Sequence, residues 1–322
     1  MNLNELAQSY SNEDAAREFI EKLRWPKGAV CPHCGVIGES YRLTAKPESR
    51  HPVRPGVWKC GACRKQFTVK VGTIFEDSHI PLATWLRAIH LLCASKKGMS
   101  AHQLHRMLGV TYKSAWFMAH RIRYAMSQEP LSNKLKGTVE VDETYIGGKE
   151  RFGPQGVKKY KYQKKAPVVA LVERGGQVRS FHREKVTGKT LKRVIMENVE
   201  PDSHVMTDDH PAYGGLRKHV RRHSKIQHSW KIYARKEGDV LMSTNTIEGY
   251  FSILKRGITG VYHHVGKQHL HRYLSEFDFR YNGRKISDGE RAELAIKGTT
   301  GKRLTYRDSR GAAPENRVSL NR

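Results

Sequence analysis

Acidic residues are scarce in this chain. Of its 322 residues, 31 are aspartate or glutamate and 58 are lysine or arginine, which gives a formal charge of +27 at neutral pH. The basic residues run through the whole length instead of gathering in one tail. Such a surface suits a polyanion, because each phosphate that a cation neutralises releases a condensed counterion. We therefore expect a protein that binds double-stranded DNA.

Long apolar runs are also missing. No stretch reaches the roughly 18 residues that a membrane-spanning helix needs. The opening residues, Met-Asn-Leu-Asn-Glu, lack the basic and apolar regions of a secretory signal. These absences exclude a helical membrane protein and argue against secretion. We expect a cytoplasmic protein that is associated with the nucleoid and has no membrane partner.

Cysteine is rare as well, with five in the chain. Four of them form two Cys-x-x-Cys pairs: Cys31, Cys34, Cys60 and Cys63. In a reducing compartment such pairs indicate zinc, and four thiolates complete a tetrahedron with no open position. The ion is therefore predicted to be structural. His33 or His51 could replace one cysteine as a ligand, and Cys93, alone in an apolar stretch, is predicted to be buried.

The segments around the cysteine pairs favour a zinc ribbon. An amphipathic segment at residues 5–25 comes first, residues 46–55 predict a polar loop, and residues 66–71 alternate like a strand. We assign residues 1–77 to an N-terminal helix and zinc ribbon.

From residue 81 the apolar periodicity becomes helical. Pro81 opens a helix that reaches Leu92, a second helix is expected over residues 99–108 with Ser100 as its N-cap, and a third over residues 112–126. Three short helices with a glycine-containing turn resemble a helix-turn-helix, so residues 78–130 are predicted to bind DNA. A plain three-helix connector is the alternative. The candidate DNA contacts on the third helix are Lys113, Arg121 and Arg123.

Residues 131–285 have the pattern of a mixed sheet with helices. Val139 and Val141 alternate with Glu140 and Asp142 in a strand that is expected to end in acids. Strands at residues 166–172 and 177–182, a helix near 190–199 and a strand at 203–209 follow. This order, closed by a helix, favours an α/β fold of the ribonuclease H-like type.

A basic loop interrupts this segment at residues 149–165. Its lysines are interleaved with Tyr160 and Tyr162, a composition that suits a phosphate backbone or a stacked base. A solvated loop fits the pattern equally well. We take Lys158 and Lys161 as candidate DNA contacts.

Residues 243–256 predict a short amphipathic helix. Glu248 and Lys255 lie two turns apart on one face, beside an apolar stripe of Ile247, Phe251, Leu254 and Ile258. Lys255 and Arg256 are further candidate DNA contacts. Glu248 could instead close a capping box with Asn245, three residues earlier.

Asp142, Asp208 and Glu248 together predict a metal site. Two Mg²⁺ (or Mn²⁺) ions about 4 Å apart need several carboxylates from rigid elements, because these hard cations prefer oxygen ligands. Such ions serve phosphoryl transfer by activating a water or a 3′-hydroxyl and by stabilising the leaving oxygen. Asp209 competes with Asp208 for the second position.

Several stretches resemble bacterial insertion-sequence transposases with an acidic triad, specifically the ISXO-type branch. They are residues 141–148, 207–213, 245–256, 260–264 and 273–282, and residues 31–34 with 72–77 are similar to that branch's zinc-ribbon leader. The resemblance implies a ribonuclease H-like core in which Asp142, Asp208 and Glu248 form the triad. Asp208 is preferred to Asp209 because it directly follows Thr207, as in the family pattern.

The same resemblance implies a function. We expect binding to the terminal inverted repeats of an insertion element, metal-dependent strand cleavage, and strand transfer into target DNA by a homodimer or higher oligomer. A DNA-binding regulator derived from a transposase, without catalysis, is the alternative. The remaining residues, 286–322, are predicted to be a basic, largely disordered tail.

Overall fold

A computed structural model describes residues 5, 10, 12–44, 53–127, 133–148, 165–226, 234–237 and 240–306. The chain divides into two compact units, residues 1–127 with 285–322, and residues 128–284. Each unit buries its own set of apolar side chains. In the described part of the chain, no helix combines the length and the apolar character that crossing a membrane requires.

The first unit begins with a helix packed on a small sheet. Helix α2 (Glu13–Arg24) starts at the N-cap Asn12. The sheet is antiparallel, with the order β1 (Ser40–Arg42), β2 (Trp58–Cys60) and β3 (Gln66–Phe67). Glu21 of α2, which is buried, joins helix to sheet by accepting from Trp58 Nε1 at 3.1 Å and pairing with Arg42 at 2.5 Å. The strand predicted over residues 66–71 corresponds to β3, which is shorter than expected.

Three helices follow close to their predicted bounds. They are α3 (Leu82–Ala94), α4 (Ala101–Leu108) and α5 (Tyr112–Met126). Ser100 caps α4 by accepting from the backbone N–H of Gln103, and Gly109 ends it with φ = 66°, a left-handed conformation that glycine adopts without strain. Thr111 then caps α5. The predicted burial of Cys93 in α3 is confirmed.

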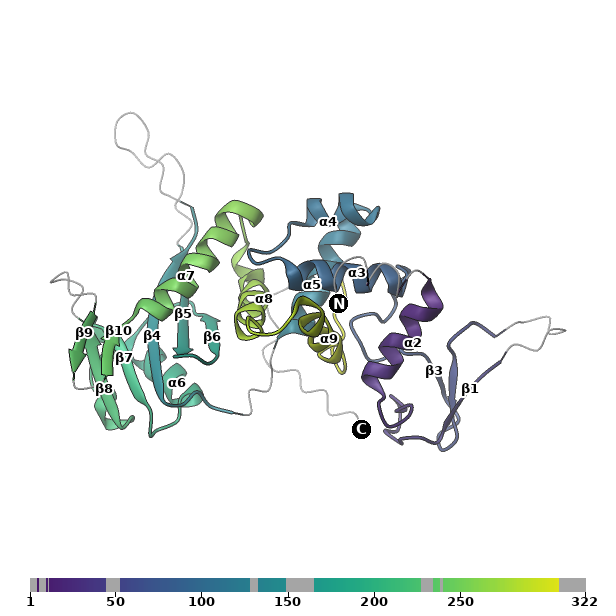
Figure 1. Ribbon diagram of the computed structural model, residues 1–322, viewed down its shortest axis with the longest axis horizontal. Coiled ribbons are helices and arrows are strands. Elements are labelled where there is room, and N and C mark those ends of the chain that lie inside the picture. Colours follow the sequence, from purple (N-terminus) through teal and green to yellow (C-terminus); the bar gives the residue numbers. More distant parts are fainter. Residues whose placement is uncertain are drawn as a thin grey trace, which may run out of the picture. The chain divides into compact units, whose positions relative to one another are not determined.

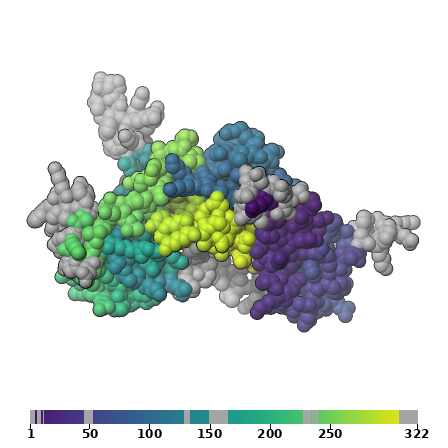
Figure 2. Space-filling view, in the orientation of Figure 1, coloured from purple at the N-terminus to yellow at the C-terminus, as the bar shows by residue number. Residues whose placement is uncertain are grey.

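The predicted disorder over residues 286–322 is wrong for its first part. Residues Asp288–Lys297 form α9, which packs against α3 in the first unit. In Figure 2 this last coloured segment lies against the N-terminal part of the same unit. A capping box of Ser287 and Glu290 starts the helix, and its buried face supplies Ala292, Ala295 and Ile296. The sequence did not predict this helix because most of its residues are polar and its apolar face is short. Residues 307–322 lie outside the described ranges.

The second unit is built on a five-stranded mixed sheet. Its order is β6-β5-β4-β7-β8, in which β5 runs antiparallel to its neighbours β4 and β6, and β7 and β8 run parallel to β4. The strands are β4 (Thr138–Ile146), β5 (Ala166–Glu173), β6 (Val178–His182), β7 (His204–Asp208) and β8 (Arg222–Ile226). Strands β9 (Ala234–Glu237) and β10 (Val240–Ser243) form a separate hairpin.

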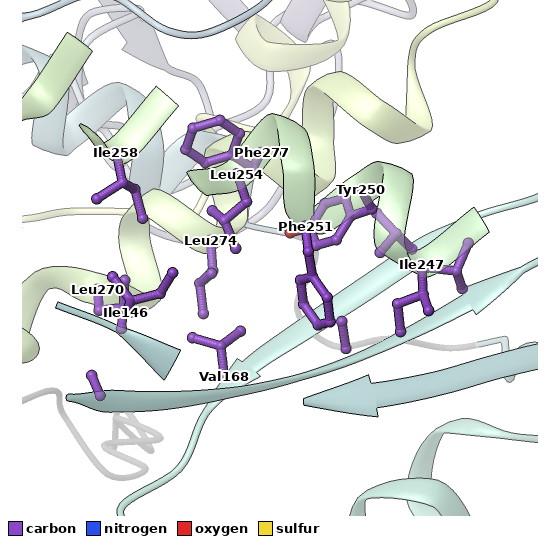
Figure 3. Close-up of a cluster of buried hydrophobic side chains, with 14 residues drawn as sticks. Ile146, Val168, Ile247, Tyr250, Phe251, Leu254, Ile258, Leu270, Leu274 and Phe277 are labelled. Atoms are coloured by element: carbon purple, nitrogen blue, oxygen red, sulfur yellow. The ribbon is translucent and has the colours of Figure 1, made fainter. Parts of the chain in front are cut away.

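Helices cover both faces of this sheet (Figure 1). Helix α6 (Gly188–Asn198) packs on the face that carries Val139 and Val141. Helices α7 (Asn245–Gly257) and α8 (Leu270–Asn282) cover the opposite face of β5. Figure 3 shows the apolar stripe predicted from the sequence packed there, with Ile247, Phe251, Leu254 and Ile258 buried against Val168 and Leu274.

Two expectations about the strands need correction. Asp142 lies in the middle of β4, which continues to Ile146, and not at a strand end. Strands β8, β9 and β10 were not predicted. The sequence of β8, Arg-His-Ser-Lys-Ile, has little apolar alternation because β8 is an edge strand.

Candidate active site and zinc cluster

Asp142 and Asp208 lie on neighbouring parallel strands. The register of β4 and β7 pairs Glu140 with Met206, and Asp142 and Asp208 each follow this pair by two residues. Side chains at paired positions of parallel strands point to the same face, and neighbouring strands are about 4.8 Å apart. Asp208 is the last residue of β7, whereas Asp209 is exposed and lies beyond it. The fold therefore places the first two predicted acids on neighbouring strands, beyond the same end of their paired segment.

Glu248 lies in the first turn of α7. Its Oε1 accepts a hydrogen bond of 3.1 Å from Oγ1 of Thr244, the N-cap residue. The N-cap makes no side-chain hydrogen bond to the backbone, and Asn245 is the first helical residue instead of the cap. The capping-box interpretation of Glu248 with Asn245 therefore does not describe this helix. The carboxylate of Glu248 is exposed.

The charges of the neighbouring acids act on Asp142. Burial raises the pKa of Asp142 to about 7, and the charges of Asp208, Glu143 and Glu248 raise it as well. The backbone N–H of Glu143, which donates to Asp142 Oδ1 at 2.8 Å, opposes that rise in pKa. Asp208 and Glu248 are thus close enough for their charges to act on Asp142. The three acids are not packed into one tight ligand set, since across the described ranges only the four-cysteine cluster brings three or more ligand atoms within 4.8 Å.

Sequence reasoning missed a fourth acid at this site. Glu143 Oε2 accepts a hydrogen bond of 2.5 Å from the hydroxyl of Tyr213, and burial raises the pKa of Glu143. Tyr213 is fully buried in the short helix η1 (Pro211–Tyr213), which follows Asp208. The signal was present, because both residues lie in the stretches that carry the transposase resemblance.

The donor set fits a hard divalent cation. Every candidate ligand is a carboxylate. The pKa of Asp142 is raised first by burial and then by the neighbouring carboxylates, and a bound cation would offset both effects. No thiol or imidazole belongs to this predicted set, so the chemistry suits Mg²⁺ or Mn²⁺ better than zinc.

The four predicted zinc ligands come together in the first unit. Their Sγ atoms all lie within 4.8 Å of one another, and Cys31–Cys63 and Cys34–Cys60 are 3.6 Å apart. Zn–S bonds of about 2.3 Å in a tetrahedron put sulfurs about 3.8 Å apart, so the cluster fits structural zinc. The backbone N–H of Cys63 donates to Cys60 Sγ and lowers the pKa of Cys60 to about 6, which favours the thiolate. His33 is not a member of the cluster.

Comparison with known proteins finds two transposase domains in the chain. Residues 134–282 match the model of the ISXO2-like transposase domain, and residues 11–66 match that of the transposase zinc-ribbon domain. The chain thus carries an ISXO2-like transposase domain and a transposase zinc-ribbon domain. A protein of Halobacterium salinarum described as an uncharacterized protein in transposable element ISH50 is 27% identical over 291 residues, which span 85% of this transposase and 92% of the relative.

A solved structure is also similar. The crystal structure of a pre-cleavage Mos1 transpososome matches 62% of the transposase and 78% of its own chain, with 10% identity and a TM-score of 0.18. A likeness at this level carries no argument about the fold.

Two predicted DNA contacts of the transposase are buried instead. Arg121 donates to the backbone oxygens of Leu304, Ile74 and Glu76 at 2.7 to 3.0 Å, and burial lowers its pKa. Arg123 is only 2% exposed. The assignment of both residues to DNA contact is therefore wrong. The C-terminal half of α5 is buried on nearly all sides, since residues 118–123, 125 and 126 are all buried, so a basic residue there is not a sign of a solvent-facing side chain.

The other basic candidates differ in their placement. Lys113, in the first turn of α5, is exposed and lies 4.8 Å from the ring centre of Tyr306. Lys255 and Arg256 are exposed at the end of α7, where Arg256 Nε donates to Ser252 O at 3.1 Å. Lys158 and Lys161 lie outside the described residues.

Proposed function

We propose that this transposase binds the terminal inverted repeats of an insertion element, cleaves DNA strands at its ends and joins the freed 3′-hydroxyls to target DNA. One observation carries the proposal: the charges of Asp208 in β7 and Glu248 in α7 both raise the pKa of Asp142 in β4. A shared pocket of carboxylates on rigid elements is what divalent-metal phosphoryl transfer needs.

The sheet topology supports a ribonuclease H-like core. Three antiparallel strands in chain order are followed by two strands parallel to the first, which gives the order β6-β5-β4-β7-β8. This arrangement agrees with the topology that the family resemblance implies.

In this mechanism Asp142, Asp208 and Glu248 hold Mg²⁺ or Mn²⁺. The bound ions supply activation of a water or a 3′-hydroxyl and stabilisation of the leaving oxygen. Asp142 and Asp208 provide a rigid base because they are fixed on adjacent strands. Glu248 approaches from the first turn of α7, and the Thr244 hydroxyl orients its carboxylate. We assign the second position to Asp208, because it and not Asp209 contributes to the raised pKa of Asp142.

The exposed cations suggest how DNA is held. Lys255 is on the same helix as Glu248, two turns further along, so we propose that it contacts phosphate near the scissile bond. Arg256 and Lys113 are proposed as further phosphate contacts, with Lys113 acting in the helix-turn-helix-like module of α4 and α5. Because an element has two ends, we also propose at least a dimer in the synaptic complex, acting on nucleoid DNA in the cytoplasm.

A strand-joining assay tests this function. Labelled element-end DNA is incubated with protein, Mg²⁺ and unlabelled target DNA, with Asp142→Asn and excess chelator as controls. Metal-dependent joined product that Asp142→Asn lacks supports the transposase. Cleavage without joining indicates a simple nuclease, and binding without cleavage indicates a regulator. Either of these two results overturns the proposal.

A further inference from the structure

A buried carboxylate lies between the two parts of the candidate site. Glu140, two residues before Asp142 in β4, is 0% exposed. Its Oε1 accepts from Thr246 Oγ1 at 2.9 Å, and its Oε2 accepts from the backbone N–H of Ile247 at 2.9 Å. Both donors belong to the first turn of α7 and directly precede Glu248. Glu140 therefore connects the strand that carries Asp142 to the helix that carries Glu248.

The bond to Ile247 replaces a missing helix cap. The first N–H groups of a helix have no partner within it, and an N-cap side chain normally accepts from the second or third of them. The N-cap of α7, Thr244, makes no such bond, and its hydroxyl donates to Glu248 instead. Glu140 accepts from the third N–H of α7 and places a negative charge at the positive end of the helix. The cap is thus supplied by a distant strand.

Arg174 completes this arrangement. It lies in the turn after β5, and its Nε donates to Glu140 Oε1 at 2.7 Å. Its Nη2 donates to the backbone oxygen and the Oγ of Ser243 at 2.9 Å each, and its Nη1 donates to the backbone oxygen of Leu241. The guanidinium compensates the buried charge of Glu140 and holds the end of β10 directly before α7.

We propose that Glu140 is a positioning residue, which fixes the first turn of α7 and thereby the place of Glu248 relative to Asp142. The inference rests on the proposed function, because it assumes that these acids bind a divalent cation. Metal ligands must be held within about 0.5 Å of their productive places, and residues that orient them change metal affinity by about 10- to 100-fold. Glu140 acts through the backbone of α7 and not as a ligand.

The test compares Glu140→Gln with Glu276→Gln. Glu276 is equally buried and has similar donors, the guanidinium of Arg280 and the Tyr262 hydroxyl, on elements that carry none of the three acids. Mn²⁺ binding to the full-length protein is measured by electron paramagnetic resonance, and Asp142→Asn defines the signal from the site. We expect Glu140→Gln to weaken Asp142-dependent binding by about 10- to 100-fold and Glu276→Gln to change it less than about twofold. Equal effects of the two variants overturn the positioning role.

Hydrogen exchange gives a second answer that needs no metal. The amide of Ile247 should lose at least about tenfold protection in Glu140→Gln and keep it in Glu276→Gln, because only the first removes the carboxylate that caps it. Unchanged protection overturns the cap. If this protection falls as expected while the wild type shows no Asp142-dependent Mn²⁺ binding, the cap stands, and both the positioning role and the proposed catalytic function fall.

A milder variant covers the case in which Glu140→Gln does not fold. Thr246→Val removes one hydrogen bond to Glu140 Oε1 and leaves the carboxylate in place. It should weaken Asp142-dependent Mn²⁺ binding by about three- to tenfold, less than Glu140→Gln, because Glu140 keeps its bonds to Ile247 and Arg174. Binding equal to the wild type contradicts the inference.

Discussion

Tyr213 and Glu143 form a hydrogen bond of 2.5 Å, in which the phenol donates to Oε2 of the carboxylate. Glu143 follows Asp142 in β4, and Tyr213 belongs to the segment that follows Asp208. The bond therefore ties together the two chain segments that carry the candidate aspartates. It also lowers the pKa of Glu143, which burial otherwise raises.

Replacing this phenol should destabilise the site. Tyr213→Phe removes the hydroxyl and leaves Glu143 without its donor, so the free energy of unfolding should fall by about 1 to 3 kcal/mol. Chemical denaturation followed by circular dichroism measures this. Tyr145→Phe is the matched control, because Tyr145 lies on the same strand but is 51% exposed and should change stability by less than about 0.5 kcal/mol. Equal losses in the two variants contradict the assignment.

Asp278 gives a prediction about pH. This partly buried residue of α8 accepts from the backbone N–H of Ser180 at 2.8 Å and from the hydroxyls of Ser180 and Tyr250 at 2.7 and 2.6 Å. Burial raises its pKa from 3.8 to about 7. The folded protein therefore holds this proton more tightly than the unfolded chain. Its contribution to stability is present at acid pH and is lost as pH rises from about 4 through 7.

The size of that contribution follows from the shift. Because the pKa of Asp278 rises from 3.8 to about 7 on folding, the free energy of unfolding should fall by about 4 kcal/mol between pH 4 and about pH 7.5. Unfolding free energies of the wild type and Asp278→Asn are compared across this range. The wild type should lose stability relative to the variant as pH rises, because asparagine does not titrate. Parallel pH profiles show that Asp278 keeps an ordinary pKa.

Variants of Arg121 and Lys113 test which of these two residues of α5 is structural and which contacts DNA. Arg121→Met leaves three backbone oxygens without their donor and should lower the free energy of unfolding by about 3 kcal/mol. The salt dependence of DNA binding by the folded fraction should stay unchanged. Lys113→Ala should leave stability within about 0.5 kcal/mol and reduce the salt slope by about one phosphate contact. If Arg121→Met reduces the salt slope with little loss of stability, and Lys113→Ala leaves the slope unchanged, Arg121 is the DNA contact after all.

Zinc should support the first unit alone. Cys60→Ser removes one of four thiolates, so the protein should lose its zinc and the ribbon should unfold, while residues 128–284 keep their structure. Elemental analysis reports the metal, and hydrogen exchange reports each unit separately. Purified wild-type protein without zinc, or a variant that retains it, speaks against the four-cysteine site.

The sequence predicted most elements of the second unit because their periodicity is strong. The stripe of α7 comes from one buried face of the helix. In β4, the apolar residues on the face under α6 alternate with acids on the opposite face. The buried arginines were misplaced for the opposite reason. Arg121 is inward-facing because three backbone oxygens receive its guanidinium, and no local pattern reveals partners as distant as Leu304.

The sequence predicted the candidate metal ligands of the site but not the residues that hold those ligands in place. Asp142, Asp208 and Glu248 lie within recognisable stretches of sequence. Glu140 and Arg174 gain their meaning only from tertiary contacts, since they join β4, the turn after β5 and the start of α7. Glu140 also looks like any acid on a polar strand face until its complete burial is known.

Strand cleavage by Glu248→Gln tests the central claim most directly. The variant keeps the size of the side chain but replaces a negative metal ligand with a neutral amide. Cleavage of element-end DNA should fall by more than about 100-fold, beyond the range for residues that only support a ligand. Metal-free DNA binding should be equal or stronger, because a negative charge facing phosphate is removed. Near-normal cleavage by a well-folded variant would contradict the assignment of Glu248 to the triad.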